Sequence, residues 1–229
     1  MLDAVMAVVV VLVGAAATFA FAQWRAERER RDVLLRRYLA QLQDSCESLW
    51  FRLKNIAYER ADTATDEEYL VTTTMYTLGR ALGIERMLAI EGLYPEIWRR
   101  FPQLRSALVP RVVDSAVAAT TRKARTEGGR ELQQYDRITL GEATVVRDGD
   151  GFRQSTFLEF RLRVEGEATE QLWWNPARAS VLALRNSNDI VKPLMAAAKR
   201  LSLALSAVTT MQSALEKEAD PHAEEVEEQ

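Results

Sequence analysis

The feature that most constrains this chain is an apolar run near its N-terminus, from Ala4 to Ala22, broken only by Gly14 and Thr18. As an α-helix the run is about 28 Å long, close to the thickness of the hydrocarbon core of a bilayer. The helix would be apolar on every side, which is typical of a membrane span and not of an amphipathic surface helix. The run therefore predicts a transmembrane anchor over residues 1–24.

The charges that flank this run predict its orientation. Asp3 precedes it and arginines follow it, and the positive-inside rule keeps the basic side in the cytoplasm. We therefore expect a single-pass protein of the cell inner (cytoplasmic) membrane, bound to the lipid bilayer, with its N-terminus outside and its C-terminal domain cytoplasmic. The alternative is a signal peptide cleaved after Ala20-Phe21-Ala22, but it lacks the basic leader of such a peptide. The residues expected at the membrane interface are Trp24, Arg25, Arg28, Arg30 and Arg31.

Residues 25–60 follow as a basic juxtamembrane stalk and the first helix of a bundle. No glycine or proline interrupts the chain between Ala15 and Thr77, so one helix can continue through this region. From Leu35 to Ile56 its apolar residues alternate in steps of four and three, which is the seam of a heptad. Such a seam either packs a helix inside a bundle or binds a protein partner or a second copy of the chain, and the helices that follow favour packing inside a bundle.

Residues 61–215 form the predicted helical cytoplasmic domain. Thr65 and Glu68 make a capping box at the start of its first helix, and Gly79 and Gly83 allow a neighbouring helix to approach closely. A long helix with an apolar stripe follows Asn188. The acidic residues 216–229 carry no apolar periodicity and are predicted to be a disordered tail. The fold class is therefore mainly α: a transmembrane helix followed by a cytoplasmic helical bundle.

The region near residues 143–165 carries two conflicting signals. The tetrapeptide from Asp148 to Gly151 is a turn, and the residues from Leu158 to Val164 alternate between apolar and charged, as in a strand. Thr156 and Glu159 form the capping box of a helix instead. The sequence thus predicts either a short β-hairpin across the turn or a helix after Thr156.

Few side chains in the chain are suited to catalysis. It has one cysteine, Cys46, and one histidine, and its net charge of -3 excludes a nucleic-acid binder that acts through bulk positive charge. We expect no cofactor, no metal site and no nucleic-acid partner. Glu85 and Glu142 are candidates for a polar site, although ion pairs with arginine also explain them. Trp173 and Trp174 either pin a loop to the core or form a binding platform.

Four short segments carry a resemblance: Leu78-Gly79-Arg80, Gly83-Ile84-Glu85-Arg86, Leu140-Gly141-Glu142 and Phe157-Leu158-Glu159-Phe160. With them the chain resembles an uncharacterised family of bacterial single-pass, N-terminally membrane-anchored helical proteins. The resemblance spans residues 35–215 and implies no catalytic residues. It implies helix around Gly141-Glu142 and after Thr156.

No catalytic motif accompanies these features. The heptad stripe and the acidic tail favour a membrane-tethered interaction or scaffold module. The alternative is a ligand-binding protein or hydrolase whose site is assembled from dispersed Glu and Arg residues. A polar pocket at Glu85 and Glu142 would favour that alternative, and an apolar core there would count against it.

Overall fold

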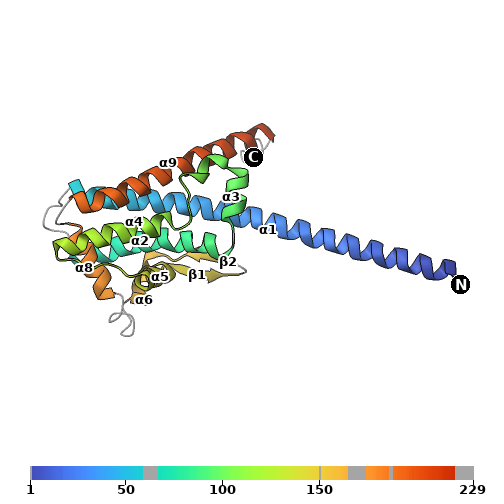
Figure 1. The fold of residues 1–229 in the computed structure, drawn as a ribbon, viewed down its shortest axis with the longest axis horizontal. Helices are drawn as coiled ribbons and strands as arrows, with labels where there is room; N and C mark the ends of the chain where they lie inside the picture. The colour runs from blue at the N-terminus through green and yellow to red at the C-terminus, as the bar shows by residue number, and fades with distance from the viewer. Residues whose placement is uncertain (1, 59–66, 150, 165–173, 186–187, 220–229) are drawn as a thin grey trace, which may run out of the picture. The chain divides into compact units, whose positions relative to one another are not determined.

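The computed structural model describes the backbone of residues 2–58, 67–149, 151–164, 174–185 and 188–219. It also describes the side chains in these ranges, apart from residues 2–13, 188 and 211–219. The fold is mainly helical, with eight α-helices and one two-stranded antiparallel sheet in the described part (Figure 1). In chain order the elements are α1 (Leu2–Tyr58), α2 (Glu67–Ile90), α3 (Tyr94–Arg100), a 3-10 turn (Pro102–Arg105), α4 (Val112–Ala124), a second 3-10 turn (Arg125–Glu127), α5 (Gln134–Ala143), β1 (Val145–Asp148), β2 (Gly151–Gln154), α6 (Phe157–Val164), α8 (Asn175–Ala183) and α9 (Asn188–Ala219).

The chain divides into two compact units, Met1–Arg37 and Tyr38–Gln229. In the first unit the described residues form one helix, the N-terminal part of α1. The second unit contains the end of α1 and all the later elements. The candidate site described below lies entirely in the second unit.

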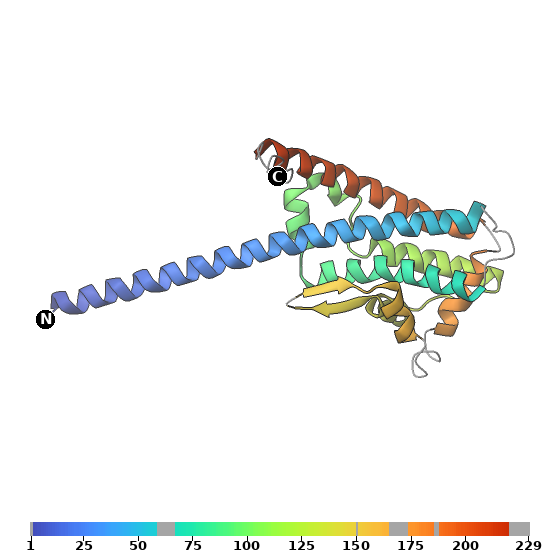
Figure 2. The same ribbon diagram turned by 180° about the vertical axis from the view of Figure 1, so that it is seen from behind.

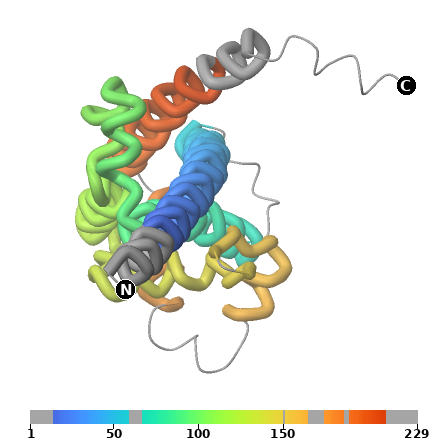
Figure 3. The backbone as a smooth tube through the Cα atoms, turned by 90° about the vertical axis from the view of Figure 1, so that its right-hand side faces the viewer, coloured from blue at the N-terminus to red at the C-terminus, as the bar shows by residue number. Residues whose placement is uncertain are grey.

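In the second unit the helices lie in layers, with the end of α1 between α9 and α2 (Figures 1 and 2). The view along the long axis shows the hairpin and α6 on the side of α2 away from α9 (Figure 3). Thr209 of α9 donates a hydrogen bond to Gln43 of α1, and Arg52 of α1 donates to Thr74 of α2. The predicted heptad stripe supplies much of the core: Leu39, Leu42, Cys46, Leu49, Leu53 and Ile56 are buried. The apolar stripe of α9 is buried as well, at Ile190, Leu194, Leu201, Leu205 and Val208.

Two glycines of α2 allow α5 to pack directly against the α2 backbone. A Cβ on Gly83 would lie 2.7 Å from the carbonyl oxygen of Gly141, and a Cβ on Gly79 would lie 2.8 Å from that of Leu140. Both distances are too short for any other residue unless the helices separate. The predicted close approach at these glycines is therefore confirmed, and its partner is α5. The segments Leu78-Gly79-Arg80 and Leu140-Gly141-Glu142 meet at this contact.

The region near residues 143–165 contains a hairpin followed by a helix. β1 pairs with β2 in an antiparallel register that sets Val145 opposite Gln154, so the predicted hairpin is confirmed over the turn. The expectation that the strand continues to Val164 is wrong, because Phe157–Val164 is α6. The capping box is present, since Thr156 and Glu159 each donate a backbone N–H to the other's side chain. Phe160 and Val164, one turn apart, are the buried face.

The predicted membrane span and the location at the inner membrane must be corrected. Among the residues that the structure describes, no helix is both long enough and apolar enough to cross a bilayer. The side chains of residues 1–13, the first part of the predicted anchor, lie outside the described residues.

Two other predicted boundaries also shift. α9 continues to Ala219, so residues 216–219 of the predicted disordered tail are helical. The rest of that tail, residues 220–229, lies outside the described residues, as does Thr65 of the predicted capping box.

Candidate functional site

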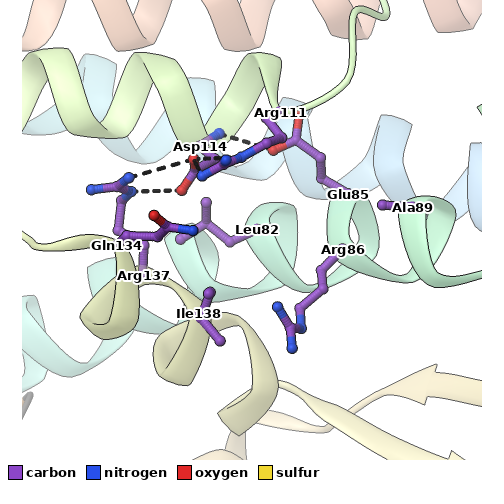
Figure 4. A pocket seen from close by; sticks show the side chains of 9 residues that line it. All are labelled: Leu82, Glu85, Arg86, Ala89, Arg111, Asp114, Gln134, Arg137 and Ile138. Atoms are coloured by element: carbon purple, nitrogen blue, oxygen red, sulfur yellow. Dashed lines mark hydrogen bonds and ion pairs between the residues drawn. The ribbon is translucent and has the colours of Figure 1, made fainter.

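A pocket of about 240 Å³ lies where α2, α4 and α5 meet (Figure 4). The close contact of α2 with α5 forms one edge, and the N-terminus of α4 lies above it. Most of its lining side chains are polar or charged. They are Leu82, Glu85, Arg86, Ala89, Arg111, Asp114, Gln134, Arg137 and Ile138.

Glu85 joins α2 to the first turn of α4. Its two carboxylate oxygens accept the backbone N–H groups of Val113 and Asp114, each at 2.9 Å. α4 has no side-chain cap of its own, because its N-cap position is occupied by Arg111. A carboxylate is well suited to this place, since the first N–H groups of a helix lack partners and carry partial positive charge. Glu85 is only 3% exposed, so it acts as a buried cap supplied by another helix.

Burial has a strong effect on the acidity of this group. Burial raises the pKa of Glu85 to about 7, although the hydrogen bonds from Asp114 and Val113 lower it in part. The charge of Asp114 raises it further, and Arg111 lowers it. Glu85 therefore changes its protonation near neutral pH at the wall of the pocket. Burial, with the charge of Glu85, also raises the pKa of the nearby Tyr94 hydroxyl.

Asp114 bridges two arginines on the same wall. Arg137 Nε donates to Asp114 Oδ1 at 2.6 Å, and Arg111 Nη2 donates to Asp114 Oδ2 at 2.7 Å. The Arg137 and Asp114 side chains are 9% and 14% exposed, so this ion pair is largely excluded from water. Burial raises the pKa of Asp114, but the hydrogen bonds from Arg137 and Arg111 outweigh it, and the net pKa lies below the usual value.

The backbone of Arg111 supports this arrangement. Its φ of 64° lies in the left-handed region, which residues other than glycine rarely adopt. The ion pair with Asp114 and the Glu85 cap fix the chain that follows it. Such a backbone conformation persists only where the surroundings fix it, and it is found often at binding sites.

The remaining polar side chains of the pocket, Arg86 and Gln134, form fewer hydrogen bonds within the described structure. Arg86 pairs with Glu142 at 2.7 Å, but its Nε is buried and has no hydrogen-bond partner in the described structure. Gln134 is exposed and forms no hydrogen bond with the other lining residues (Figure 4). Leu82, Ala89 and Ile138 add an apolar surface. The pocket thus combines hydrogen-bond donors that the fold does not use with a small apolar wall.

The two glutamates predicted from the sequence, Glu85 and Glu142, do not both line the pocket. Glu85 lines the pocket, whereas Glu142 does not line it and reaches it only through Arg86. The expected pairing with arginine is confirmed for Glu142, while Glu85 binds backbone N–H groups instead. Among the described residues, no three His, Cys, Asp or Glu side chains gather in a way that could hold a metal ion.

Of the two predicted tryptophans, Trp174 lies among the described residues and is buried. Trp174 is 6% exposed, and its ring centroid lies 6.5 Å from that of Phe160. Trp173 lies outside the described residues, so the binding platform stays a prediction.

The predicted interface residues of α1 pair along the helix. Trp24 is 56% exposed, and the Arg28 guanidinium lies 5.5 Å from its ring centroid. Arg25 pairs with Glu29 at 3.1 Å, and both Arg30 and Arg31 pair with Glu27. These residues were predicted to lie at the membrane interface because a transmembrane anchor was predicted before them, and that anchor has been corrected above.

Sequence reasoning missed most of the pocket. Arg111, Asp114, Gln134 and Arg137 are scattered over two helices and a loop, with no spacing that marks them as a group. The only available signal was the adjacent pair Glu85-Arg86 beside Gly83, at the close contact between two helices. No family model, no curated protein and no solved structure matches the chain.

Proposed function

We propose that this chain is a small-molecule-binding protein and that its site is the pocket between α2, α4 and α5. The observation that carries the proposal is the set of unused donors in that pocket. A buried N–H without a partner, such as Arg86 Nε, costs folding free energy, so native structures seldom keep one. Nε is covered in the structure, so the Arg86 guanidinium must turn towards the pocket before a ligand can accept its hydrogen bonds and remove that cost.

The size of the pocket limits what can bind. A volume of about 240 Å³ is slightly below the range of roughly 300 to 1,000 Å³ typical of small-molecule sites. The ligand is therefore a small metabolite and not a nucleotide or a peptide. Convergent polar groups on an apolar wall are the usual composition of such sites.

Protein-detected NMR on the full chain tests this proposal. The probes are amino acids, short-chain carboxylates, amides, amines, sugars and inorganic phosphate. Ala89 lines the pocket and is exposed, so Ala89→Trp closes the pocket without disturbing the core. The matched control is Ala119→Trp, an exposed alanine of α4 that does not line the pocket.

The expected result is saturable binding of at least one probe that Ala89→Trp abolishes and Ala119→Trp preserves. If no probe binds, or if Ala89→Trp binds as the wild type does, the pocket is not a ligand site. Circular dichroism of both variants confirms that they fold.

A second candidate is the interaction module predicted from the sequence, without the membrane tether. The heptad stripe from Leu39 to Ile56 is buried in the chain itself, so the interface must lie elsewhere. Leu158 and Leu162, one turn apart on α6, are each 63% exposed. Such an apolar face favours association with another protein surface, here a second copy of the chain.

Sedimentation tests this second function. An oligomer of the full chain that dissociates in the double variant Leu158→Ser, Leu162→Ser supports it. A chain that is monomeric at high concentration, or an oligomer that the double variant leaves intact, contradicts it.

A further inference from the structure

We infer that the ligand of the pocket is a small organic monoanion, a carboxylate with a short apolar body, which Arg86 binds. This inference rests on the proposed binding function and adds the chemical class of the ligand. It depends on which groups of the pocket are engaged, on the charge of the wall and on its apolar part.

The two carboxylates of the pocket wall already have partners. Both carboxylate oxygens of Glu85 accept backbone N–H groups of α4. Both carboxylate oxygens of Asp114 accept guanidinium N–H groups, from Arg137 and from Arg111. A cationic ligand would have to compete with these partners for each oxygen. The pocket is therefore poorly suited to an amine.

The guanidinium of Arg86, in contrast, has a hydrogen-bond donor without a partner in the described structure. Among the described residues, Arg86 Nε has no partner, and Arg86 forms an ion pair with Glu142, whose side chain is 52% exposed. An exposed pair of this kind contributes little, so Glu142 competes weakly for the guanidinium. Because Nε is covered in the structure, the guanidinium must turn towards the pocket to bind a ligand. A carboxylate then matches the planar edge of the guanidinium with two parallel hydrogen bonds.

The charge of the wall also selects an anion. The lining contains three guanidinium groups, on Arg86, Arg111 and Arg137, and two carboxylates, on Glu85 and Asp114. Asp114 is shared by Arg111 and Arg137 and offsets one of the three positive charges, and ionised Glu85 offsets another. One positive charge is left among the lining residues, which matches a ligand with one negative charge.

The apolar part of the wall distinguishes a carboxylate from inorganic phosphate. Leu82, Ala89 and Ile138 can bury a short hydrocarbon chain, and phosphate has none. Phosphate also carries more than one negative charge near neutral pH. We therefore choose an organic carboxylate over phosphate, although both are oxyanions that Arg86 could bind.

Four probes on the full chain test the inference by calorimetric titration at fixed ionic strength: valerate, valeramide, pentylammonium and inorganic phosphate. Valerate and valeramide have nearly the same shape and differ in charge. We expect valerate to bind at least about tenfold more tightly than valeramide, because hydrogen bonds to charged groups are the stronger ones. Ala89→Trp should abolish this binding.

Two variants test the role of Arg86. Arg86→Gln should weaken valerate binding about tenfold or more and leave valeramide binding nearly unchanged. Glu142→Gln should tighten valerate binding a few-fold, because it removes the competing carboxylate. A purely structural role of the Arg86–Glu142 pair would not produce that gain.

Three other outcomes would contradict parts of this proposal. Equal binding of valeramide, or binding of pentylammonium or phosphate in preference to valerate, overturns the carboxylate assignment but leaves a ligand site in the pocket. Weaker valerate binding in Glu142→Gln overturns the role given to Arg86. If none of the probes of either experiment binds in a way that Ala89→Trp abolishes, the proposed binding function fails with it.

Discussion

The ion pairs around the pocket and those along the first unit use the same residue types in opposite ways. Arg137 and Asp114 come from α5 and α4, are 23 residues apart, and are largely excluded from water. Arg25 and Glu29 lie one turn apart on α1, with side chains 71% and 67% exposed. The first pair can form only when α4 and α5 are correctly packed, whereas the second needs nothing beyond a helix. Ion pairs therefore report on tertiary structure only where they are buried and distant in sequence.

The largest expected effect is at Asp114. Asp114→Ala should lower the free energy of unfolding by about 3–5 kcal/mol, because it leaves the buried Arg137 guanidinium without its carboxylate. Chemical denaturation of the full chain measures this change. Asp189→Ala is the matched control, since its ion pair with Lys192 is exposed, and a loss of no more than about 1 kcal/mol is expected. Equal losses of unfolding free energy in both variants would contradict the proposal that a buried ion pair stabilises the fold more than an exposed one.

The next largest effect is the dependence of the free energy of unfolding on pH, to which Glu85 contributes. Its pKa is about 7 in the folded chain and 4.5 as the ordinary value, so between these pH values the folded state holds the proton more strongly. Stability should therefore fall as the pH rises from about 4.5 to about 7, by up to about 3 kcal/mol. The groups that face Glu85 are Asp114, Arg111, Tyr94 and Cys46.

Denaturation at pH 5 and pH 7.5 measures this contribution. The low pKa of Asp114 and the raised pKa values of Tyr94 and Cys46 place their titrations outside that window. Glu85→Gln should therefore remove the pH-dependent part of the stability. If the variant retains the full dependence, Glu85 is not its source.

A smaller effect is expected at the contact between α2 and α5. Gly83→Ala places a Cβ 2.7 Å from the Gly141 carbonyl oxygen, so the two helices must separate. We expect a loss of about 1–3 kcal/mol in the free energy of unfolding. Gly14→Ala is the control, since a Cβ there meets nothing within 4 Å and alanine favours a helix. A stability loss at Gly14 that equals the loss at Gly83 would contradict the steric explanation.

The smallest effect is expected on α1. Glu29→Gln removes the exposed pair with Arg25 and should change the free energy of unfolding by no more than about 0.5 kcal/mol. Added salt should reduce even this difference, because exposed charges are screened. A loss comparable to that of Asp114→Ala would show that exposure does not decide the strength of these pairs.

The sequence predicted what depends on local patterns. The heptad stripe, the close approach at Gly79 and Gly83, and the Asp-Gly turn each follow from residue spacing, and the structure contains all three. The strand predicted up to Val164 failed because alternation over eight residues also fits a helix that buries positions four apart. The capping box of Thr156 was the better local signal.

The pocket could not be predicted in the same way. Its residues come from α2, α4 and α5 and from the loop before α4, and only packing brings them together. Glu85 was predicted, together with Glu142, as a polar residue that could lie inside the helical bundle. Its actual role, the capping of another helix, depends on where α4 begins in space. The predicted membrane anchor is contradicted, because no helix among the described residues is both long and apolar enough to cross a bilayer.

The N–H resonance of Arg86 Nε reports directly on whether Arg86 binds a small carboxylate in the pocket. Arginine side chains labelled with ¹⁵N are observed in the full chain while valerate is added. We expect the Arg86 signal, assigned by its loss in Arg86→Gln, to shift in a saturable way, and we expect Ala89→Trp to abolish the shift. An Arg86 signal that valerate leaves unchanged, or that moves equally in Ala89→Trp, would show that Arg86 does not bind the carboxylate in this pocket.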